Sequence, residues 1–105
     1  MKKGSIILIP FPFTDLKGNK IRPAVVLSEN ELDVTICFVT SEHKWKTEYD
    51  IAISPSESNG LKVPSLIRVG KIATIDSALA LGELGELSHS EIEELNKSLK
   101  RLLQL

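Results

Sequence analysis

Two polar residues, Arg22 and Thr40, stand at the ends of apolar segments and could together act on a phosphodiester. An arginine guanidinium is planar, cationic and able to bind a phosphate through two parallel hydrogen bonds. A neighbouring hydroxyl can help to hold a five-coordinate phosphorus. Because arginine is a poor proton donor, we expect Arg22 to stabilise developing negative charge, an effect typically worth about 10²- to 10³-fold in rate.

Two apolar segments, residues 21–28 and 34–40, are predicted to form the strands that carry these side chains. The second segment alternates apolar and other residues, as a strand with one buried face does. Pro23 lacks a backbone donor and therefore belongs near the start or the edge of a strand. It also restricts Arg22 to an extended backbone, which fixes the arginine before a ligand binds. The polar residues between the segments predict a hairpin.

The register of this hairpin decides whether Arg22 and Thr40 meet. One count assumes that Glu29–Asp33 forms a five-residue loop, with Ser28 opposite Val34. Arg22 then lies opposite Thr40 on the same face, with Cβ atoms about 4.5–5.5 Å apart. A four-residue loop would instead place Arg22 opposite the residue before Thr40. In the simpler alternative, Arg22 is a solvated charge on an edge strand and Thr40 an ordinary strand-end residue.

The segment after Ser41 holds an indole between two cations, in the tripeptide Lys44-Trp45-Lys46. Such a tripeptide can stack a base and hold adjacent phosphates, at about 1–3 kcal/mol per stacked base. Trp45 could equally fill part of the core. His43 could act as a general base, although a histidine in a polar loop is more often merely solvated.

Further short strands are predicted around the hairpin. They are expected at residues 5–9, 49–54, 66–69 and 71–75, and their close spacing favours a small barrel or sandwich over alternating strands and helices.

The C-terminal segment is predicted to be an amphipathic helix that packs on the barrel. Ser88-His89-Ser90-Glu91 has the pattern of a capping box, which marks the helix start. Apolar residues then recur at helical spacing. They are Ile92, Leu95, Leu99, Leu102 and Leu103.

Composition limits the class of protein. The chain has 105 residues, of which 42% are hydrophobic, which suits one domain over residues 1–105. A net charge of −1 argues against a protein that holds nucleic acid through a strongly basic face. Cys37 is the only cysteine, so no intrachain disulfide can form. A lone cysteine in an apolar strand is expected to be a small buried hydrophobe and suits a reducing cytoplasm.

Several kinds of site are missing from the sequence. It contains no P-loop, no cysteine or histidine pair at metal-binding spacing, and no Gly-x-Ser-x-Gly motif. We therefore expect neither a metal nor a cofactor. No apolar stretch approaches the length that spans a bilayer, and Pro10 and Pro12 interrupt the first apolar run, so neither membrane insertion nor secretion is expected.

An ordered set of motifs resembles the MazF/PemK family of type II toxin-antitoxin toxins. These motifs are Gly4–Asp15, Lys20–Ser28, Val39–Ser41, Gly60-Leu61, Ser65–Arg68 and Lys71–Asp76. The resemblance implies a mostly β fold, an SH3-like barrel of the MazF/CcdB type with a C-terminal helix. It also implies a homodimeric, metal-independent endoribonuclease that cuts single-stranded RNA, including mRNA, through attack of the 2′-hydroxyl, leaving a cyclic phosphate.

The resemblance also implies roles for particular residues and partners. Arg22 and Thr40 fall at the family's catalytic positions. A cognate antitoxin would cover the RNA groove, and any contact with DNA would be made through that antitoxin. Residues expected to contact RNA, from the resemblance and from the tripeptide above, are Asp15, Lys20, Ser41, Lys44, Trp45, Lys46 and Ser65.

Two other functions stay open. A gyrase inhibitor of the CcdB type shares the barrel, but such proteins rely on a Trp-Gly-Ile end and this chain ends in Arg101–Leu105. A noncatalytic module on the same fold could bind RNA or a protein. Two departures from the family pattern keep that alternative open: Ser5, where the family usually has Asp, and Lys71, near which many members carry Gln.

Overall fold

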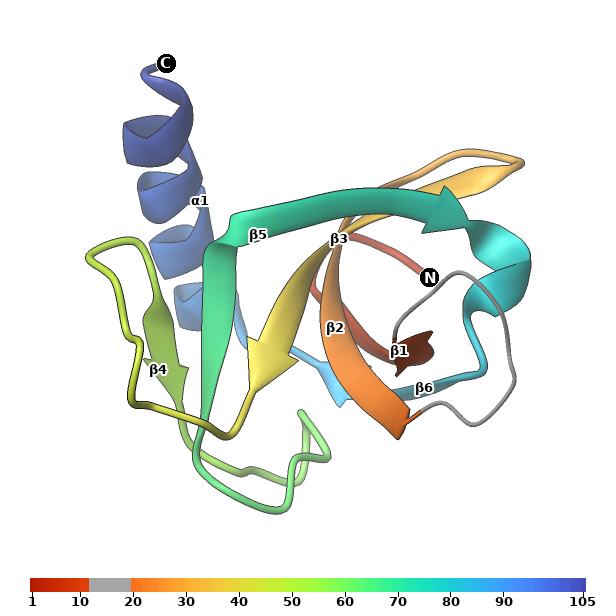
Figure 1. Cartoon of the computed structure of the whole chain (residues 1–105), viewed down its shortest axis with the longest axis horizontal. Helices are drawn as coiled ribbons and strands as arrows, with labels where there is room; N and C mark the ends of the chain where they lie inside the picture. The colour runs from red at the N-terminus through yellow and green to blue at the C-terminus, as the bar shows by residue number, and fades with distance from the viewer. Residues whose placement is uncertain (12–19) are drawn as a thin grey trace.

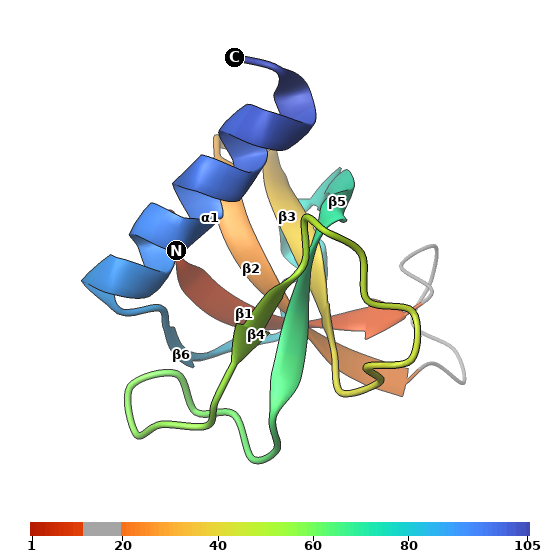
Figure 2. The same cartoon turned by 90° about the vertical axis from the view of Figure 1, so that its left-hand side faces the viewer.

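The computed structural model describes residues 1–11 and 20–105. Over these residues, six antiparallel strands form one sheet in the order β4-β5-β3-β2-β1-β6. The sheet curves into a half-barrel, and the helix α1 runs across one side of it (Figures 1 and 2). The elements are β1 (Ser5–Phe11), β2 (Lys20–Glu29), β3 (Asp33–Thr40), β4 (Ile51–Ile53), β5 (Ser65–Asp76), a 3₁₀ turn (Ser77–Leu79), β6 (Gly82–Glu86) and α1 (His89–Leu103). The prediction of a mostly β fold closed by a C-terminal helix is confirmed.

Apolar side chains on both faces of the central strands are buried, which explains the unbroken apolar run in β1. Ile6 and Val25 belong to a cluster that α1 closes with Leu95, whereas Ile7 and Ile9 belong to a second cluster on the opposite face. Cys37 is fully buried in the first cluster, as expected.

The β2–β3 hairpin differs from the predicted loop and still reaches the predicted register. Glu29 lies opposite Val34, so the connection has four residues, and the expected pairing of Ser28 with Val34 is wrong. A register shift between Val26 and Ser28 then adds one residue to β2, and from Val26 onward the partners follow the predicted count.

The last described pair of this register is Ala24 opposite Phe38. Counting two residues further along each strand sets Arg22 level with Thr40. The loop has the four residues of the alternative count, but the bulge shifts the register by one residue. Arg22 therefore does not lie opposite Val39, as that count predicted. The structure thus brings the two residues to the same end of the hairpin by a route that the sequence count did not include.

β5 and β6 depart most from the predicted strands. The two runs at 66–69 and 71–75 form one strand that turns a corner (Figure 1), where the register on β3 shifts between Cys37 and Phe38. β6 was not predicted, since its sequence Gly-Glu-Leu-Gly-Glu lacks β-branched residues. Its Gly85 is needed because a Cβ there would lie 2.3 Å from the Ser58 carbonyl oxygen.

The helix begins as the capping box predicts. The Ser88 hydroxyl accepts from the Glu91 amide at 3.2 Å, and the Glu91 carboxylate accepts from the Ser88 amide at 2.8 Å. Leu95 is fully buried and Leu102, in the last turn, packs against the same core cluster, whereas Leu103 is 53% exposed, so the predicted apolar stripe is confirmed except at Leu103. The buried Ser98 hydroxyl donates to the Tyr49 carbonyl at 2.6 Å and ties the helix to the segment before β4. Among the described residues, no helix has the length and hydrophobicity needed to cross a membrane.

Candidate functional site

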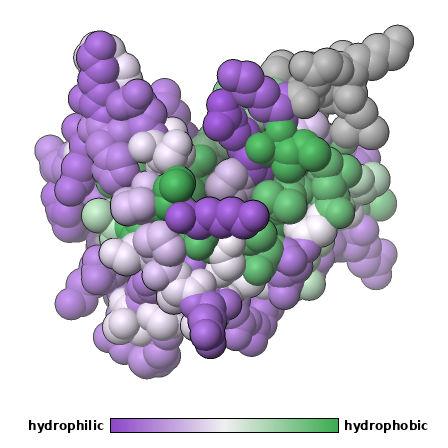
Figure 3. All heavy atoms as spheres, turned by 90° about the horizontal axis from the view of Figure 1, so that it is seen from below, coloured by the Kyte–Doolittle hydropathy of each residue, from purple (hydrophilic) through white to green (hydrophobic). Residues whose placement is uncertain are grey.

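Two open cavities share a wall at the end of the molecule where β2 begins and β3 ends, and Arg22 and Thr40 line both of them. The first, which we call the Ser65 cavity, has a volume of about 260 Å³, and the second, the Arg68 cavity, about 360 Å³. Seen from this end, hydrophobic surface lies directly beside hydrophilic side chains (Figure 3). An extended chain molecule that crosses the shared wall could therefore contact Arg22 and Thr40 while one of its residues lies in each cavity.

The position of Arg22 comes from its strand. Its Cα lies opposite Ile9 of β1, and Pro23 follows it, so the backbone is held by sheet pairing as well as by the proline. Its side chain is exposed, which leaves the guanidinium accessible to a phosphate in either cavity.

Thr40 is the last residue of β3 and lies opposite Leu66 of β5. Its hydroxyl oxygen accepts a hydrogen bond from the Glu42 amide at 3.1 Å. That bond orients the side chain and leaves the hydroxyl proton available to donate to a ligand.

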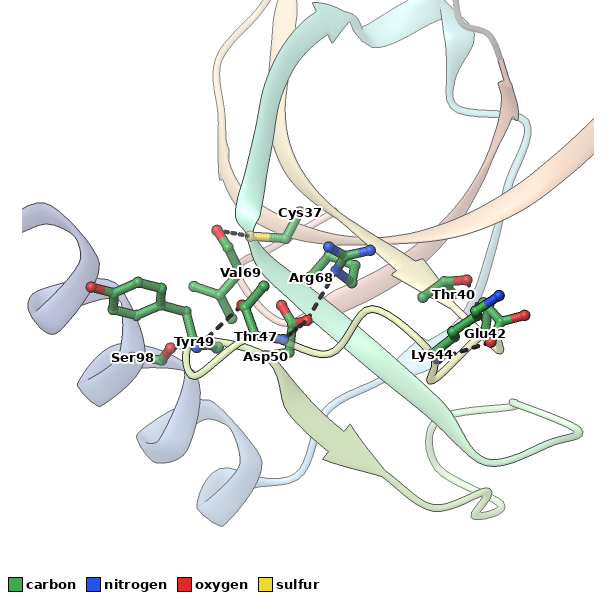
Figure 4. A network of polar contacts seen from close by, with 10 residues as sticks. All are labelled: Cys37, Thr40, Glu42, Lys44, Thr47, Tyr49, Asp50, Arg68, Val69 and Ser98. Carbon is green, nitrogen blue, oxygen red and sulfur yellow. Dashed lines mark hydrogen bonds and ion pairs between the residues drawn. The ribbon is translucent and has the colours of Figure 1, made fainter.

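The loop after Thr40 presents Trp45 to solvent. Trp45 is 67% exposed, so the alternative in which it fills the core is wrong. The Lys44 ammonium lies 5.1 Å from the centre of its ring, within the range of a cation–π contact. The Lys44 amide donates to the Glu42 carboxylate at 2.8 Å, which folds the loop back toward Thr40 (Figure 4). Within the described residues, Lys44, Trp45 and Lys46 do not line either cavity.

The remaining expected contacts are divided between the site and its surroundings. Ser41 and Ser65 line the Ser65 cavity, where the buried Ser65 hydroxyl donates to the Val63 carbonyl at 3.0 Å. Lys20 is exposed at the start of β2, opposite Phe11, and is not among the described residues that line the cavities. Asp15 lies outside the described residues. His43 is exposed, with its Nε2 3.2 Å from the Pro64 carbonyl oxygen, and lines neither cavity as far as the chain is described.

Sequence reasoning missed the cationic side of the site. Arg68 and Lys71, both on β5, line the Arg68 cavity together with Arg22. Arg68 forms an ion pair with Asp50, in which Nε lies 3.0 Å from the carboxylate, and Asp50 in turn accepts from the Thr47 amide at 2.9 Å (Figure 4). No spacing in the sequence signals this pair, because the two residues come from a loop end and a different strand.

The two cavities differ in the number of cationic side chains that line them, and the Asp50 carboxylate balances the charge of one of these, Arg68. Arg22, Arg68 and Lys71 give the Arg68 cavity three cations, and no carboxylate is among its described lining residues. The Ser65 cavity has only Arg22 and Lys62 as charged groups among its described lining, and most of the rest is apolar. In the described part of the chain, no group of three His, Cys, Asp or Glu side chains is placed to hold a metal ion.

Ser5, the first departure from the family pattern, lies away from this site. It is buried at the start of β1, opposite Glu86 of β6, and its hydroxyl accepts from the Lys2 amide at 3.0 Å. The described lining of the two cavities does not include it. Lys71, the second departure, lines the Arg68 cavity directly.

Solved structures share this fold over nearly the whole chain. An endoribonuclease in complex with its cognate antitoxin from a Mycobacterial species has a TM-score of 0.78 at 20% identity, with 100% of this chain and 96% of that chain covered. The Mycobacterium tuberculosis toxin MazF-mt6 has a TM-score of 0.78 at 19% identity, covering 96% and 97%. MazF from Deinococcus radiodurans has a TM-score of 0.76 at 21% identity, covering 100% and 97%.

At these identities the likeness shows a common fold. No curated protein sequence matches the chain. A family model, described as PemK-like, MazF-like toxin of type II toxin-antitoxin system, matches residues 2–103. The chain therefore belongs to the PemK-like, MazF-like toxin family of type II toxin-antitoxin systems.

Proposed function

We propose that this toxin is a metal-independent endoribonuclease that cuts single-stranded RNA, including mRNA, at the shared wall of the two cavities. The observation that carries the proposal is the convergence of Arg22 and Thr40 on both cavities from different strands. Family membership supports it, as do the solved endoribonucleases of the same fold. We take residues 1–105 to act as one toxin domain in the cytoplasm.

In the proposed reaction the nucleophile comes from the RNA itself. The 2′-hydroxyl oxygen attacks the adjacent phosphorus, the bond from phosphorus to the 5′ oxygen breaks, and the products are a 2′,3′-cyclic phosphate and a free 5′-hydroxyl. The proton lost from the 2′-hydroxyl passes to solvent, and the leaving oxygen takes up one in return. No metal is needed in this scheme, since a cationic side chain can neutralise the charge that develops on the phosphoryl oxygens.

Each proposed catalytic residue has a separate task. The Arg22 guanidinium binds two phosphoryl oxygens and stabilises the five-coordinate phosphorus, as bidentate arginine contacts allow. The Thr40 hydroxyl, already fixed by the Glu42 amide, donates its proton to a phosphoryl oxygen. Both groups thereby favour the transition state over the ground state, which is what raises a rate.

The surrounding residues would hold the RNA strand. The exposed Trp45, with Lys44 over its ring, offers a face on which a base can stack at the exit from the site. Ser41 and Ser65 offer hydroxyl groups to a base or sugar in the Ser65 cavity. Lys20, Lys46 and Asp15 complete the set of proposed RNA contacts.

We further propose that the toxin is a homodimer neutralised by a cognate antitoxin, with any DNA contact made through the antitoxin. The solved structures of this fold include an endoribonuclease in complex with its cognate antitoxin from a Mycobacterial species and MazE-MazF from Deinococcus radiodurans. A light-scattering mass of twice 11.6 kDa is expected for the pure toxin, and a mass of 11.6 kDa would contradict the dimer.

The test of the enzyme is a digestion of long, mixed-sequence single-stranded RNA in excess chelator, with the product ends read by mass spectrometry. Cyclic-phosphate ends that disappear with Arg22→Ala are expected. RNA that stays intact at high protein concentration would overturn the endoribonuclease and favour a noncatalytic binding module.

A further inference from the structure

The Arg68 cavity contains a second arginine whose environment differs from that of Arg22. The Arg68 side chain is 20% exposed, and the Asp50 carboxylate that faces its Nε is 1% exposed. A buried carboxylate holds a guanidinium strongly in one orientation, because little water competes for either charge. Arg68 is therefore fixed in the cavity wall before any ligand arrives.

The contact with Asp50 leaves much of the Arg68 guanidinium unused. A guanidinium has five N–H donors, and the ion pair involves the Nε edge alone. Nε itself is buried without an aligned hydrogen-bond acceptor among the described residues, so even that donor is only partly satisfied. The two terminal nitrogens have no hydrogen-bond partner in the described part of the chain. Arg68 lines a cavity that Arg22 and Lys71 also line.

An anion is the ligand that suits this arrangement. The three cations line one open volume of about 360 Å³ without a carboxylate among the described lining residues. The cavity wall also contains Phe11, which is 46% exposed and packs edge-on against Phe38 with ring centres 5.6 Å apart. Cations next to a partly exposed aromatic ring suit a nucleotide unit, whose phosphate would bind the cations and whose base would contact the ring.

Resting on the proposed function, we propose that Arg68 binds a second backbone phosphate of the RNA, the neighbour of the phosphate held by Arg22 and Thr40. Asp50 is the positioning residue that holds Arg68 in place. We place the two phosphates next to each other because Arg22 and Thr40 line the Arg68 cavity as well as the Ser65 cavity. Arg68 would then contribute to substrate affinity and leave the chemical step unchanged.

The variant that tests this proposal replaces both members of the ion pair. Arg68→Met alone would leave the Asp50 charge buried and unpaired, which is strongly destabilising. The double variant Asp50→Asn/Arg68→Met avoids that problem, keeps an oxygen for the Thr47 amide and leaves the net charge at −1. The matched control is Glu48→Gln/Arg101→Met, which removes an exposed pair of the same 3.0 Å separation between the segment before β4 and α1.

The measurement is the salt dependence of binding to a labelled 12-nucleotide single-stranded DNA of random sequence, which lacks the 2′-hydroxyl and cannot be cut. Each phosphate contact contributes about −0.7 to the slope of log affinity against log salt for a single strand. The Asp50/Arg68 variant is expected to lose one such increment, which is about an eightfold weaker affinity at 50 mM salt that fades toward 1 M. A slope equal to that of the wild type, or an equal loss in the control, would overturn the proposal.

Two further measurements keep the outcomes separate. In the wild type, the Arg68 Nε–H NMR signal should shift when the DNA is added and that of Arg101 should not; an unmoved Arg68 signal would overturn the proposal even if the double variant did not fold. RNA cleavage by the wild type is measured in parallel. A lost slope increment without cleavage would keep the second phosphate site and reject the nuclease, whereas cleavage with an unchanged slope would do the reverse.

Discussion

The Ser65 cavity and the Arg68 cavity share Arg22 and Thr40, but the other residues that line them differ in type and in the elements they come from. The Ser65 cavity is bounded by the loop that precedes β5, with a glycine, two serines and apolar side chains. The Arg68 cavity is bounded by strands and carries three cations, one of them fixed by a buried carboxylate. This difference suggests that loop atoms of the Ser65 cavity contact a base or sugar of the RNA, whereas the cations on the strands of the Arg68 cavity contact the RNA backbone.

Variants of the shared wall should disable both cavities and have the largest effect. Arg22→Ala and Thr40→Ala are each expected to lower the single-turnover rate of RNA cleavage by about 10²- to 10³-fold, because each removes a contact made in the transition state. Arg22 is exposed, so its replacement should leave the thermal unfolding curve unchanged. Cleavage by both variants at the wild-type rate would contradict the assignment of the site.

Asp50→Asn should disturb the Arg68 cavity alone, through its support. It leaves Arg68 largely buried without a counter-charge, and breaking a buried pair in this way costs about 3 kcal/mol of unfolding free energy. Glu48→Gln breaks the pair with Arg101, whose side chains are 68% and 57% exposed, and should cost under about 1 kcal/mol. Urea unfolding measures both, and equal losses would mean that burial does not distinguish the two pairs.

Gly60→Ala should disturb the Ser65 cavity alone. Gly60 has φ +70°, and an added Cβ would lie 2.3 Å from the Leu84 carbonyl oxygen. The left-handed backbone alone costs a non-glycine residue about 1–2 kcal/mol, so a total loss of at least about 2 kcal/mol is expected in urea unfolding. Gly70→Ala is the matched control, since a Cβ there meets no atom within 4 Å. A similar loss at both positions would show that neither the left-handed backbone nor the close approach of Leu84 is what requires Gly60.

Cys37 lines neither cavity in the described part of the chain, and its contribution to the free energy of unfolding should change only at alkaline pH. Burial raises the pKa of its thiol from 9.0 to about 12, so between these values the unfolded chain ionises while the native thiol stays protonated. The native state then holds more protons, and the free energy of unfolding falls as pH rises, by about 1.4 kcal/mol per pH unit. Urea unfolding from pH 7 to 10.5 should show this fall in the wild type relative to Cys37→Ala. Parallel curves would contradict it.

The sequence was sufficient to bring Arg22 and Thr40 together, although the predicted hairpin was wrong in detail. Apolar periodicity located both strands. Pro23 lies near the start of β2, as one of its two predicted positions had it, but β2 is an inner strand of the sheet and not an edge strand. The loop is one residue shorter than predicted and a bulge after Val26 compensates for it. Bulges follow from the tertiary packing of a strand more than from local residue preferences, so a count along the sequence could not anticipate this one.

Arg68 and β6 show what sequence reasoning could not reach. Arg68 gains its place from Asp50, and nothing in the spacing of the two residues indicates that a loop end will face the middle of β5. β6 lacks the residue types of a strand and forms because β1 has an edge to pair with. Trp45 left two readings open, since an indole between lysines fits either a core or a surface, and only its 67% exposure decided between them.

The most direct test of the central claim is a single 2′-deoxy substitution. Once a cleaved linkage is mapped on long RNA, an oligonucleotide with that linkage is made twice, once as RNA and once with deoxyribose at the attacking nucleotide only. If Arg22 and Thr40 promote attack by the 2′-hydroxyl, the RNA should be cut in excess chelator and the substituted strand should stay intact at that linkage while binding equally well. Cleavage of the substituted strand at the same linkage would contradict the mechanism.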